Sequence, residues 1–103
     1  MALDFAQIDN DGMITGNVPI GIEAHANIFD KMDMDRYKYL ERIRDYYSDT
    51  IYYSDDLSGL MKDLIALRDD NLSVACNIVL IESMIELVVD AISKKYRIEV
   101  ISD

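Results

Sequence analysis

Hydrophobic and polar positions follow spacings that change along the chain, and the first two segments are strand-like. Residues 2–9, ALDFAQID, are mostly apolar and run into DNDG, whose Asp, Asn and Gly residues favour a tight turn. Val18, Ile20 and Ile22 then occupy every second position, which predicts a second strand. Pro19 has no backbone N–H to donate, so this strand is expected at a sheet edge or in an irregular part of the sheet.

From about Ile22 the apolar residues adopt the spacing of helices. A short helix is predicted to end near Asp33, and its apolar residues are Ala24, Ile28, Phe29 and Met32. Asp33 or Asp35 could cap a second helix, whose apolar stripe is Met34, Tyr37, Leu40 and Ile43. Ser54 is the expected N-cap of a third, whose apolar face is Leu57, Leu60, Met61, Leu64 and Leu67.

The longest predicted element is a helix over residues 71–95, NLSVACNIVLIESMIELVVDAISKK. Its apolar residues leave only a narrow polar strip, so we expect a central helix that is covered on most sides. Cys76 lies in this apolar run and is expected to be an inert core thiol. Residues 96–103, YRIEVISD, predict a final strand with Ile98, Val100 and Ser102 on one face.

These elements predict one α+β domain over residues 1–103, a length that suits a single hydrophobic core. The domain is expected to be mainly helical, with about four helices and a long central helix near its C-terminus. A small sheet is expected from the N-terminal strands and the C-terminal strand, with the long helix packed across them.

The charge balance narrows the choice of partners. Twenty acids and ten bases give a net charge of −10, which repels phosphate backbones and anionic membranes and attracts basic proteins. Residues 1–30, 45–61 and 69–93 contain acids and no Lys or Arg, so the negative charge is uneven along the chain. We therefore expect no binding to nucleic acid or membrane, whereas imitation of a nucleic acid or capping of a basic protein stays open.

The location of the protein is predicted from its cysteine content and its N-terminus. A lone cysteine, Cys76, cannot form an internal disulfide, which fits a reducing compartment. MALDFAQID has neither the basic nor the long apolar region of a signal peptide. Glu82, Glu86 and Asp90 interrupt the apolar run at 72–92 and make membrane insertion costly. A cytoplasmic protein is expected.

Motifs for catalysis, metals and cofactors are weak. QIDNDG resembles the start of a calcium-binding EF-hand loop, but Gln7 and Val18 occupy the first and twelfth ligand positions, so a hairpin turn is favoured. A nucleophilic pair of Cys76 and His25 is conceivable, yet His25 is better interpreted as a structural hydrogen-bonding residue. One Cys and one His do not make a zinc site. We predict no catalytic residues, no metal and no cofactor.

The segment DYYSDTIYYSDD at 45–56 is the strongest candidate for a partner-binding site. Adjacent tyrosines cannot both face one core, so one of each pair should be exposed, where tyrosine rings beside carboxylates suit Lys and Arg of a partner. The candidate residues are Asp45, Tyr46, Tyr47, Asp49, Tyr52, Tyr53, Asp55 and Asp56. The alternative is a loop whose tyrosines cover the edge of the core and whose aspartates cap helices. The two interpretations are compatible, with one tyrosine of each pair inside and one outside.

A second acidic feature lies on the long helix. Glu82, Glu86 and Asp90 are spaced by four residues and fall on one helical face. They could form a binding stripe, although the solvated strip of an otherwise buried helix is favoured.

The segments ALDFAQID, IGIEAHANIF, DYYSDTIYYSDDLSGLMKDLIAL and the terminal ISD together resemble small bacterial immunity proteins of contact-dependent growth inhibition and related polymorphic toxin systems. The resemblance covers most of the chain in layout. It implies a cytoplasmic protein that binds and blocks a toxin domain, often a basic nuclease. A 1:1 complex with the toxin is expected. This class shares no binding motif, so the resemblance assigns no site residues.

The expected function is therefore that of an immunity protein that neutralises a basic toxin, with a ribonuclease favoured. Its rival is a cytoplasmic adaptor or regulatory subunit that binds a basic cellular protein through the same surface. A small enzyme is the third possibility, and it would need an exposed His25 beside Cys76 or a pair of carboxylates.

Overall fold

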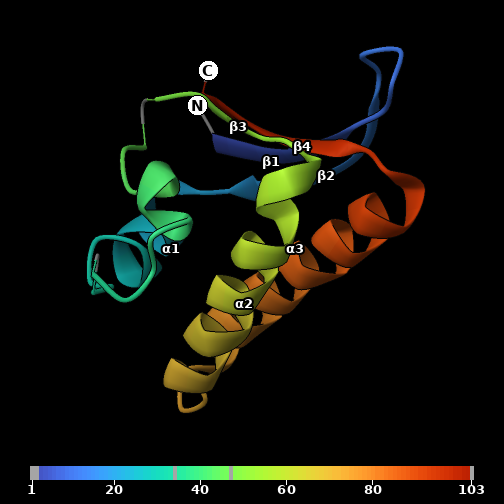
Figure 1. Ribbon diagram of the computed structural model, residues 1–103. Coiled ribbons are helices and arrows are strands. Elements are labelled where there is room, and N and C mark those ends of the chain that lie inside the picture. The colour runs from blue at the N-terminus through green and yellow to red at the C-terminus, as the bar shows by residue number, and fades with distance from the viewer. Residues whose placement is uncertain (1–2, 34, 47, 103) are drawn as a thin grey trace.

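The computed structural model describes residues 3–33, 35–46 and 48–102. Its elements are β1 (Leu3–Ile8), β2 (Ile14–Ile20), α1 (Ile22–Ile28), the 3-10 helix η1 (Leu40–Ile43), β3 (Thr50–Tyr52), α2 (Ser54–Asp70), α3 (Ala75–Lys94) and β4 (Arg97–Ser102). The chain is α+β, as its hydrophobic pattern predicted. Figure 1 shows α2 and α3 beneath one face of the sheet.

The four strands form one antiparallel sheet in the order β2-β1-β4-β3. β1 lies between β2 and β4, so that Phe5 is paired with Val18 on one side and with Val100 on the other. This arrangement confirms that the C-terminal strand pairs with the N-terminal strands. β2 is an edge strand, as Pro19 predicted, since its outer side needs no donor at that position.

The sheet contains a strand that the sequence did not predict. β3 has three residues, of which Tyr52 is paired with Ile98 of β4. A segment this short shows no alternation of its own, and its pairing depends on β4, which lies more than forty residues further along the chain.

The described part of the chain contains three α-helices, so the prediction of about four was wrong. The predicted helix through Tyr37, Leu40 and Ile43 is reduced to η1, while these three side chains are still buried. Asp63 of α2 explains the difference, because its Oδ2 accepts the backbone N–H groups of Tyr39 and Leu40, at 2.8 and 3.3 Å. A tertiary contact thus fixes where the turn begins.

The prediction that the long helix is covered on most sides was also wrong. α3 buries one stripe against the sheet and α2, formed by Ile81, Met84, Val88 and Ala91. Val79 and Val89 on its other side are 67% and 51% exposed. Cys76 lies in the first turn of α3 and is exposed rather than part of the core.

The core fills the space between the sheet and the helices. Its members from the sheet include Leu3, Phe5, Ile20, Tyr52, Ile98 and Val100, and those from α2 are Leu57, Leu60, Leu64 and Leu67. α2 begins at Ser54 and its N-cap is Tyr53, one residue earlier than predicted. No helix in the described residues has an apolar stretch of the length needed to cross a membrane.

Candidate partner-binding surface

Tyr52 lies in the core and offers no surface to a partner. It is 0% exposed, and its hydroxyl donates a hydrogen bond to the backbone carbonyl of Tyr39. Arg42 covers the ring, with its guanidinium carbon 5.0 Å from the ring centroid. Burial raises the pKa of the Tyr52 hydroxyl, and the positive charge of Arg42 offsets part of that rise.

Tyr46 is also a core residue, with 6% of its surface exposed. Its ring meets that of His25 edge to face, with 5.0 Å between centroids, and its hydroxyl donates to the carbonyl of Ile20 at 3.4 Å. Burial therefore removes both Tyr46 and Tyr52 from the set of candidate contact residues. Tyr47 lies outside the described residues.

Among the described tyrosines of this segment, Tyr53 reaches the surface, with 59% exposure. The pair Tyr52 and Tyr53 thus has one ring inside and one outside, as the alternation of a strand requires. Tyr53 shares a shallow hollow with Lys95 and Arg97, so cations as well as carboxylates lie near it.

Most of the candidate aspartates of this segment have partners within the chain. Asp49 accepts the backbone N–H of Ser102 at 2.7 Å, and Asp45 accepts the hydroxyl of Ser48 at 2.7 Å. Asp56 forms an ion pair with Arg42 at 3.2 Å. Asp55 is exposed in the first turn of α2, where its negative charge interacts favourably with the positive end of the helix dipole. The described residues of the segment thus mainly make contacts within the fold, whereas Tyr53 and Asp55 stay exposed to a partner.

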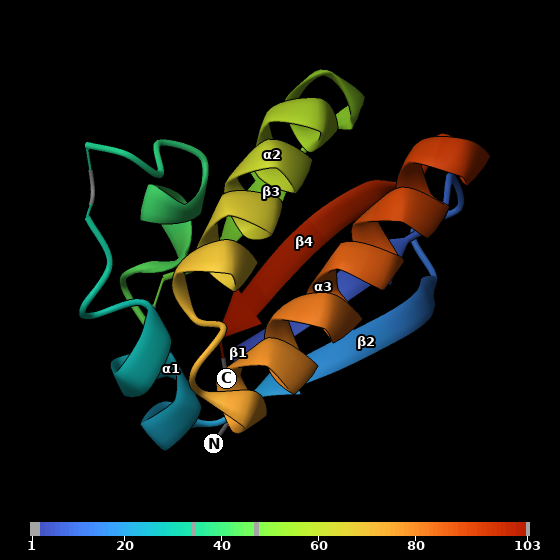
Figure 2. The same cartoon turned by 90° about the horizontal axis from the view of Figure 1, so that it is seen from below.

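A different surface gathers acids, of which Asp90 is paired with Lys94 at 3.0 Å. Figure 2 shows α3 running beside the edge strand β2, and an open groove of about 500 Å³ lies between them. Glu86 and Asp90 are the charged residues that line this groove, next to Asn17 and Pro19 of β2. Glu82 and Glu86 are exposed and form no ion pair with any described residue.

The same side of α3 carries exposed apolar side chains. Val79, Glu82, Glu86 and Val89 follow one another at helical spacing, so two valines bracket two glutamates on one face. We call this stripe, together with the groove against β2, the α3 face. An exposed stripe that mixes apolar and acidic residues is suited to a partner that is both basic and apolar.

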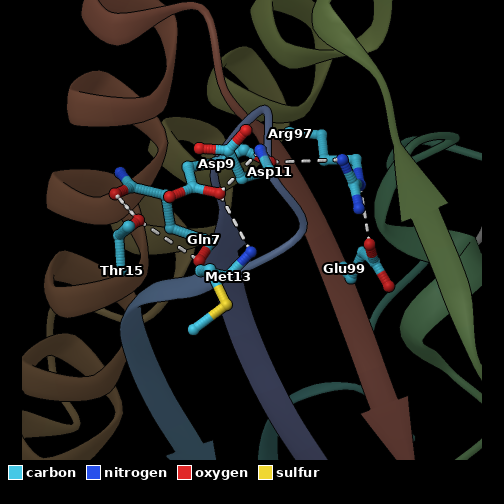
Figure 3. Close-up of polar contacts among 7 residues, drawn as sticks. All are labelled: Gln7, Asp9, Asp11, Met13, Thr15, Arg97 and Glu99. Atoms are coloured by element: carbon cyan, nitrogen blue, oxygen red, sulfur yellow. Dashed lines mark hydrogen bonds and ion pairs between the residues drawn. The ribbon is translucent and has the colours of Figure 1, made fainter.

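Gln7 holds the hairpin of β1 and β2 against α3. Its Nε2 donates to the carbonyl of Leu87 at 3.2 Å and to Asp90 Oδ2 at 3.0 Å, and its Oε1 accepts the hydroxyl of Thr15 at 2.6 Å. Figure 3 shows Gln7 and Thr15 together beside the hairpin. A glutamine at an inward position of an apolar strand was the sequence signal for this link, and it was missed.

The hairpin turn itself is closed by Asp9. Its Oδ1 accepts the backbone N–H groups of Asp11 and Met13, both at 2.9 Å (Figure 3), and Gly12 adopts a φ of 82°. The segment DNDG therefore forms the hairpin turn that the sequence favoured, and the Asp9 carboxylate closes it.

Asp90 should make stability depend on pH. The hydrogen bond from Gln7, followed by that from Lys94, holds the pKa of Asp90 below its ordinary value. A lowered pKa means that the ionised carboxylate stabilises the fold at neutral pH, and that this contribution disappears as the pH falls through the folded-state pKa. We expect Asp90→Asn to lower Tm at pH 7, and the difference from the native chain to shrink below about pH 4.

Asp11→Asn is the matched control, because it makes the same charge change at an exposed carboxylate for which the described residues offer no partner. Thermal unfolding followed by circular dichroism from pH 7 to pH 2 measures both variants. A gap between Asp90→Asn and the native chain that stays constant with pH would contradict the role given to the ionised carboxylate.

His25 and Cys76, the pair conceivable for catalysis, are not in contact. His25 is 2% exposed, and its Nε2 lies 2.6 Å from the carbonyl of Ile43, which confirms a structural hydrogen bond. No contact in the described residues joins it to the exposed Cys76. The described residues also hold no cluster of His, Cys, Asp and Glu suited to a metal ion.

Comparison with protein-family models, curated proteins and solved structures gives no match to this chain. Function is therefore inferred from the surface and cavities of the molecule.

Proposed function

We propose that this protein is an immunity protein that binds a basic toxin domain, a ribonuclease being favoured, and neutralises it in the cytoplasm. The observation that carries the proposal is the α3 face, where an open groove has carboxylates as its charged lining. The resemblance in layout to immunity proteins supports the same function.

The charge of the whole molecule supports a basic partner. None of the acids in the described residues is buried, so the net charge of −10 acts from the surface. Such a field speeds encounter with a positively charged domain and weakens as salt is added. Carboxylates at the rim of a contact mainly raise the association rate, whereas desolvated ones at its centre also slow dissociation.

The α3 face provides the local fit. Lys or Arg of the partner would enter the groove toward Glu86, while Val79 and Val89 pack against apolar side chains beside it. Tyr53 and Asp55 belong to a different part of the surface, at the start of α2, and serve as a second contact in this proposal. Because the phosphate-binding surface of a nuclease is itself basic, the acidic face would occupy the place of the substrate.

Identification of the partner tests the function. A tagged copy is used to capture proteins from the native host, and bound proteins are released by salt and identified by mass spectrometry. A basic toxin domain recovered at 1:1 ratio, together with protection of cells that express this toxin, is the expected result. Recovery of a housekeeping protein instead would replace the immunity role with that of an adaptor.

Charge reversal tests the surface. Glu82→Lys combined with Glu86→Lys should weaken binding of the basic partner by at least about a hundredfold, since two attractions become repulsions. Asp35→Lys combined with Glu41→Lys makes the same net change among exposed residues before and within η1. Calorimetric titration compares the two variants at one salt concentration. Equal losses would show that net charge alone matters and would exclude the α3 face as the contact.

A further inference from the structure

Strand β2 leaves one edge of the sheet open. Among the described residues it is hydrogen-bonded to β1 alone, so the backbone groups along its outer side have no partner strand. Figure 2 shows β2 at the border of the sheet, and no other strand of the described chain lies outside it. The strand at the opposite edge, β3, has three residues and β2 has seven, so β2 is the longer template for an added strand.

Two irregularities limit the open edge to a short stretch. Thr15 is an extra residue where the register with β1 shifts, and Pro19 has no N–H to offer. Edge strands commonly use bulges, proline and charged residues to discourage pairing with another chain. The residues between these two, Gly16–Val18, pair one by one with β1 and carry no charge. This stretch is therefore available to a further strand.

The pairing with β1 indicates which backbone groups point outward. Successive residues of an antiparallel strand direct their N–H and C=O groups alternately toward and away from the neighbouring strand. Pro19 is paired with Asp4 but has no N–H to donate to it, so positions 17 and 19 are expected to face away from β1. Asn17 then offers an N–H and a C=O to an added strand, and Pro19 offers a C=O.

The groove between β2 and α3 runs along this edge. Its lining consists of Gly16, Asn17, Val18 and Pro19 of β2 and Ser83, Glu86, Leu87 and Asp90 of α3. Four consecutive residues of the strand line it, whereas a groove over one face of a sheet would meet every second residue. The groove therefore opens onto the backbone edge of β2, in the place that a fifth strand would occupy about 4.8 Å away.

Close packing at Gly16 brings α3 to this edge. A Cβ atom on Gly16 would lie 2.6 Å from Cδ1 of Leu87, so the helix touches the strand where a side chain would not fit. Glu86 adjoins Leu87, lines the groove and forms no ion pair with any described residue. Asp90 is paired with Lys94 at 3.0 Å. Glu86 is thus the charge available to an occupant, and no Lys or Arg is among the described residues that line the groove.

We propose that the edge of β2 binds an extended basic segment of the partner, which joins the sheet as a fifth strand. Its backbone pairs with Asn17 and with the Pro19 carbonyl. Its side chains alternate between the two faces of the sheet, so those on the helix side enter the groove, where a Lys or Arg meets Glu86. The inference rests on the basic partner proposed above and specifies the element by which that partner docks.

A second copy of this chain is the less suitable occupant. Two β2 edges joined about a two-fold axis perpendicular to the sheet would place their helices on the same side, with Glu86 of one copy facing that of the other. Like charges in a shared groove repel one another, and each chain has a net charge of −10. The charge of the groove therefore favours a cationic segment.

Peptides test the edge on the intact chain without any partner protein. Acetyl-TKTKTKT-amide supplies cations on alternate positions of a strand, its analogue with every backbone nitrogen methylated keeps the charge and loses the donors, and acetyl-TETETET-amide reverses the charge. With the first peptide we expect saturable amide NMR shifts at Gly16–Val18 and Glu86, and slower hydrogen exchange at Asn17. The methylated analogue should bind at least about tenfold more weakly, since its backbone cannot donate to β2, and the acidic peptide should not bind.

Equal binding of the methylated peptide would show that charge alone attracts it and would overturn the proposal, as would the absence of saturable shifts at β2 with the first peptide. These results are separate from the capture of a toxin. A captured toxin without peptide binding at β2 would refute the added strand and leave the immunity role in place. Peptide binding without a captured toxin would refute the immunity role alone.

Two variants locate the peptide on the edge. Asn17→Pro removes an outward N–H, and it should abolish peptide binding while changing Tm little, because the pairing with β1 is kept. A large fall in its Tm would show that this N–H serves β1, and would overturn the geometry. Glu86→Gln should weaken binding several-fold, whereas Glu41→Gln, the same change at an exposed residue of η1, should not. Equal affinities of these two variants would exclude the groove.

Discussion

Replacing Tyr52 with alanine is expected to destabilise the fold by about 3–5 kcal/mol, the range found when large aromatic core residues are truncated. The ring is fully buried, its hydroxyl satisfies the carbonyl of Tyr39, and Arg42 stacks over it. This substitution therefore opens a cavity, leaves the Tyr39 carbonyl without its donor and removes the ring against which the Arg42 guanidinium packs. Urea unfolding followed by circular dichroism gives the change in the free energy of unfolding.

The neighbouring residue is the control. Tyr53→Ala removes an identical side chain that is 59% exposed, and it should change the free energy of unfolding by less than about 0.5 kcal/mol. Tyr52→Phe keeps the ring and should lose about 1 kcal/mol for the hydrogen bond to Tyr39. Similar losses for Tyr52→Ala and Tyr53→Ala would show that the two rings are not divided between core and surface.

His25→Ala is expected to cost about 2–5 kcal/mol, because it combines a cavity with a lost hydrogen bond in the core. The His25 ring lies between those of Phe29 and Tyr46, at centroid distances of 5.2 and 5.0 Å. Its Nε2 faces the carbonyl of Ile43 at 2.6 Å, so Nε2 carries the proton and donates it. This bond ties α1 to the end of η1.

A second substitution separates packing from hydrogen bonding at this position. His25→Phe retains most of the volume but leaves the Ile43 carbonyl without its donor, and it should cost about 1–3 kcal/mol. Asn27→Ala, on the exposed side of α1, should change stability by less than about 0.5 kcal/mol. Stability of His25→Phe equal to that of the native chain, again measured in urea, would exclude a contribution from the hydrogen bond.

The α3 face illustrates why a surface is harder to predict than an element. The 3.6-residue spacing of α3 was clear in the sequence, and the spacing of Glu82, Glu86 and Asp90 placed them on one side. Whether that side would be covered depended on how many layers the fold has. With one layer of helices on the sheet, the valines beside the glutamates are exposed, and Asp90 is drawn to Gln7.

The segment at 45–56 shows the same limit. Because adjacent tyrosines cannot both face one core, the sequence predicted that one ring of the pair at 52 and 53 is exposed, but not which one. The choice came from β4, which pairs Tyr52 with Ile98 and thereby directs its ring toward the helices. From the sequence, the aspartates of the segment could contact either a partner or the rest of the chain. In the structure, Asp56 pairs with Arg42, and Asp49 accepts the backbone N–H of Ser102.

Patterns along the chain were enough to predict the α+β class, the two long helices and the hairpin turn at Asp9, because each depends on residues that are near one another in the chain. The pattern did not predict the short strand β3, the replacement of a helix by η1 or the exposure of one side of α3. These features arise from contacts between distant segments, such as Asp63 with Tyr39 and Gln7 with Asp90. The spacing of residues along the chain does not predict such contacts, because they stabilise the protein only when the elements pack together.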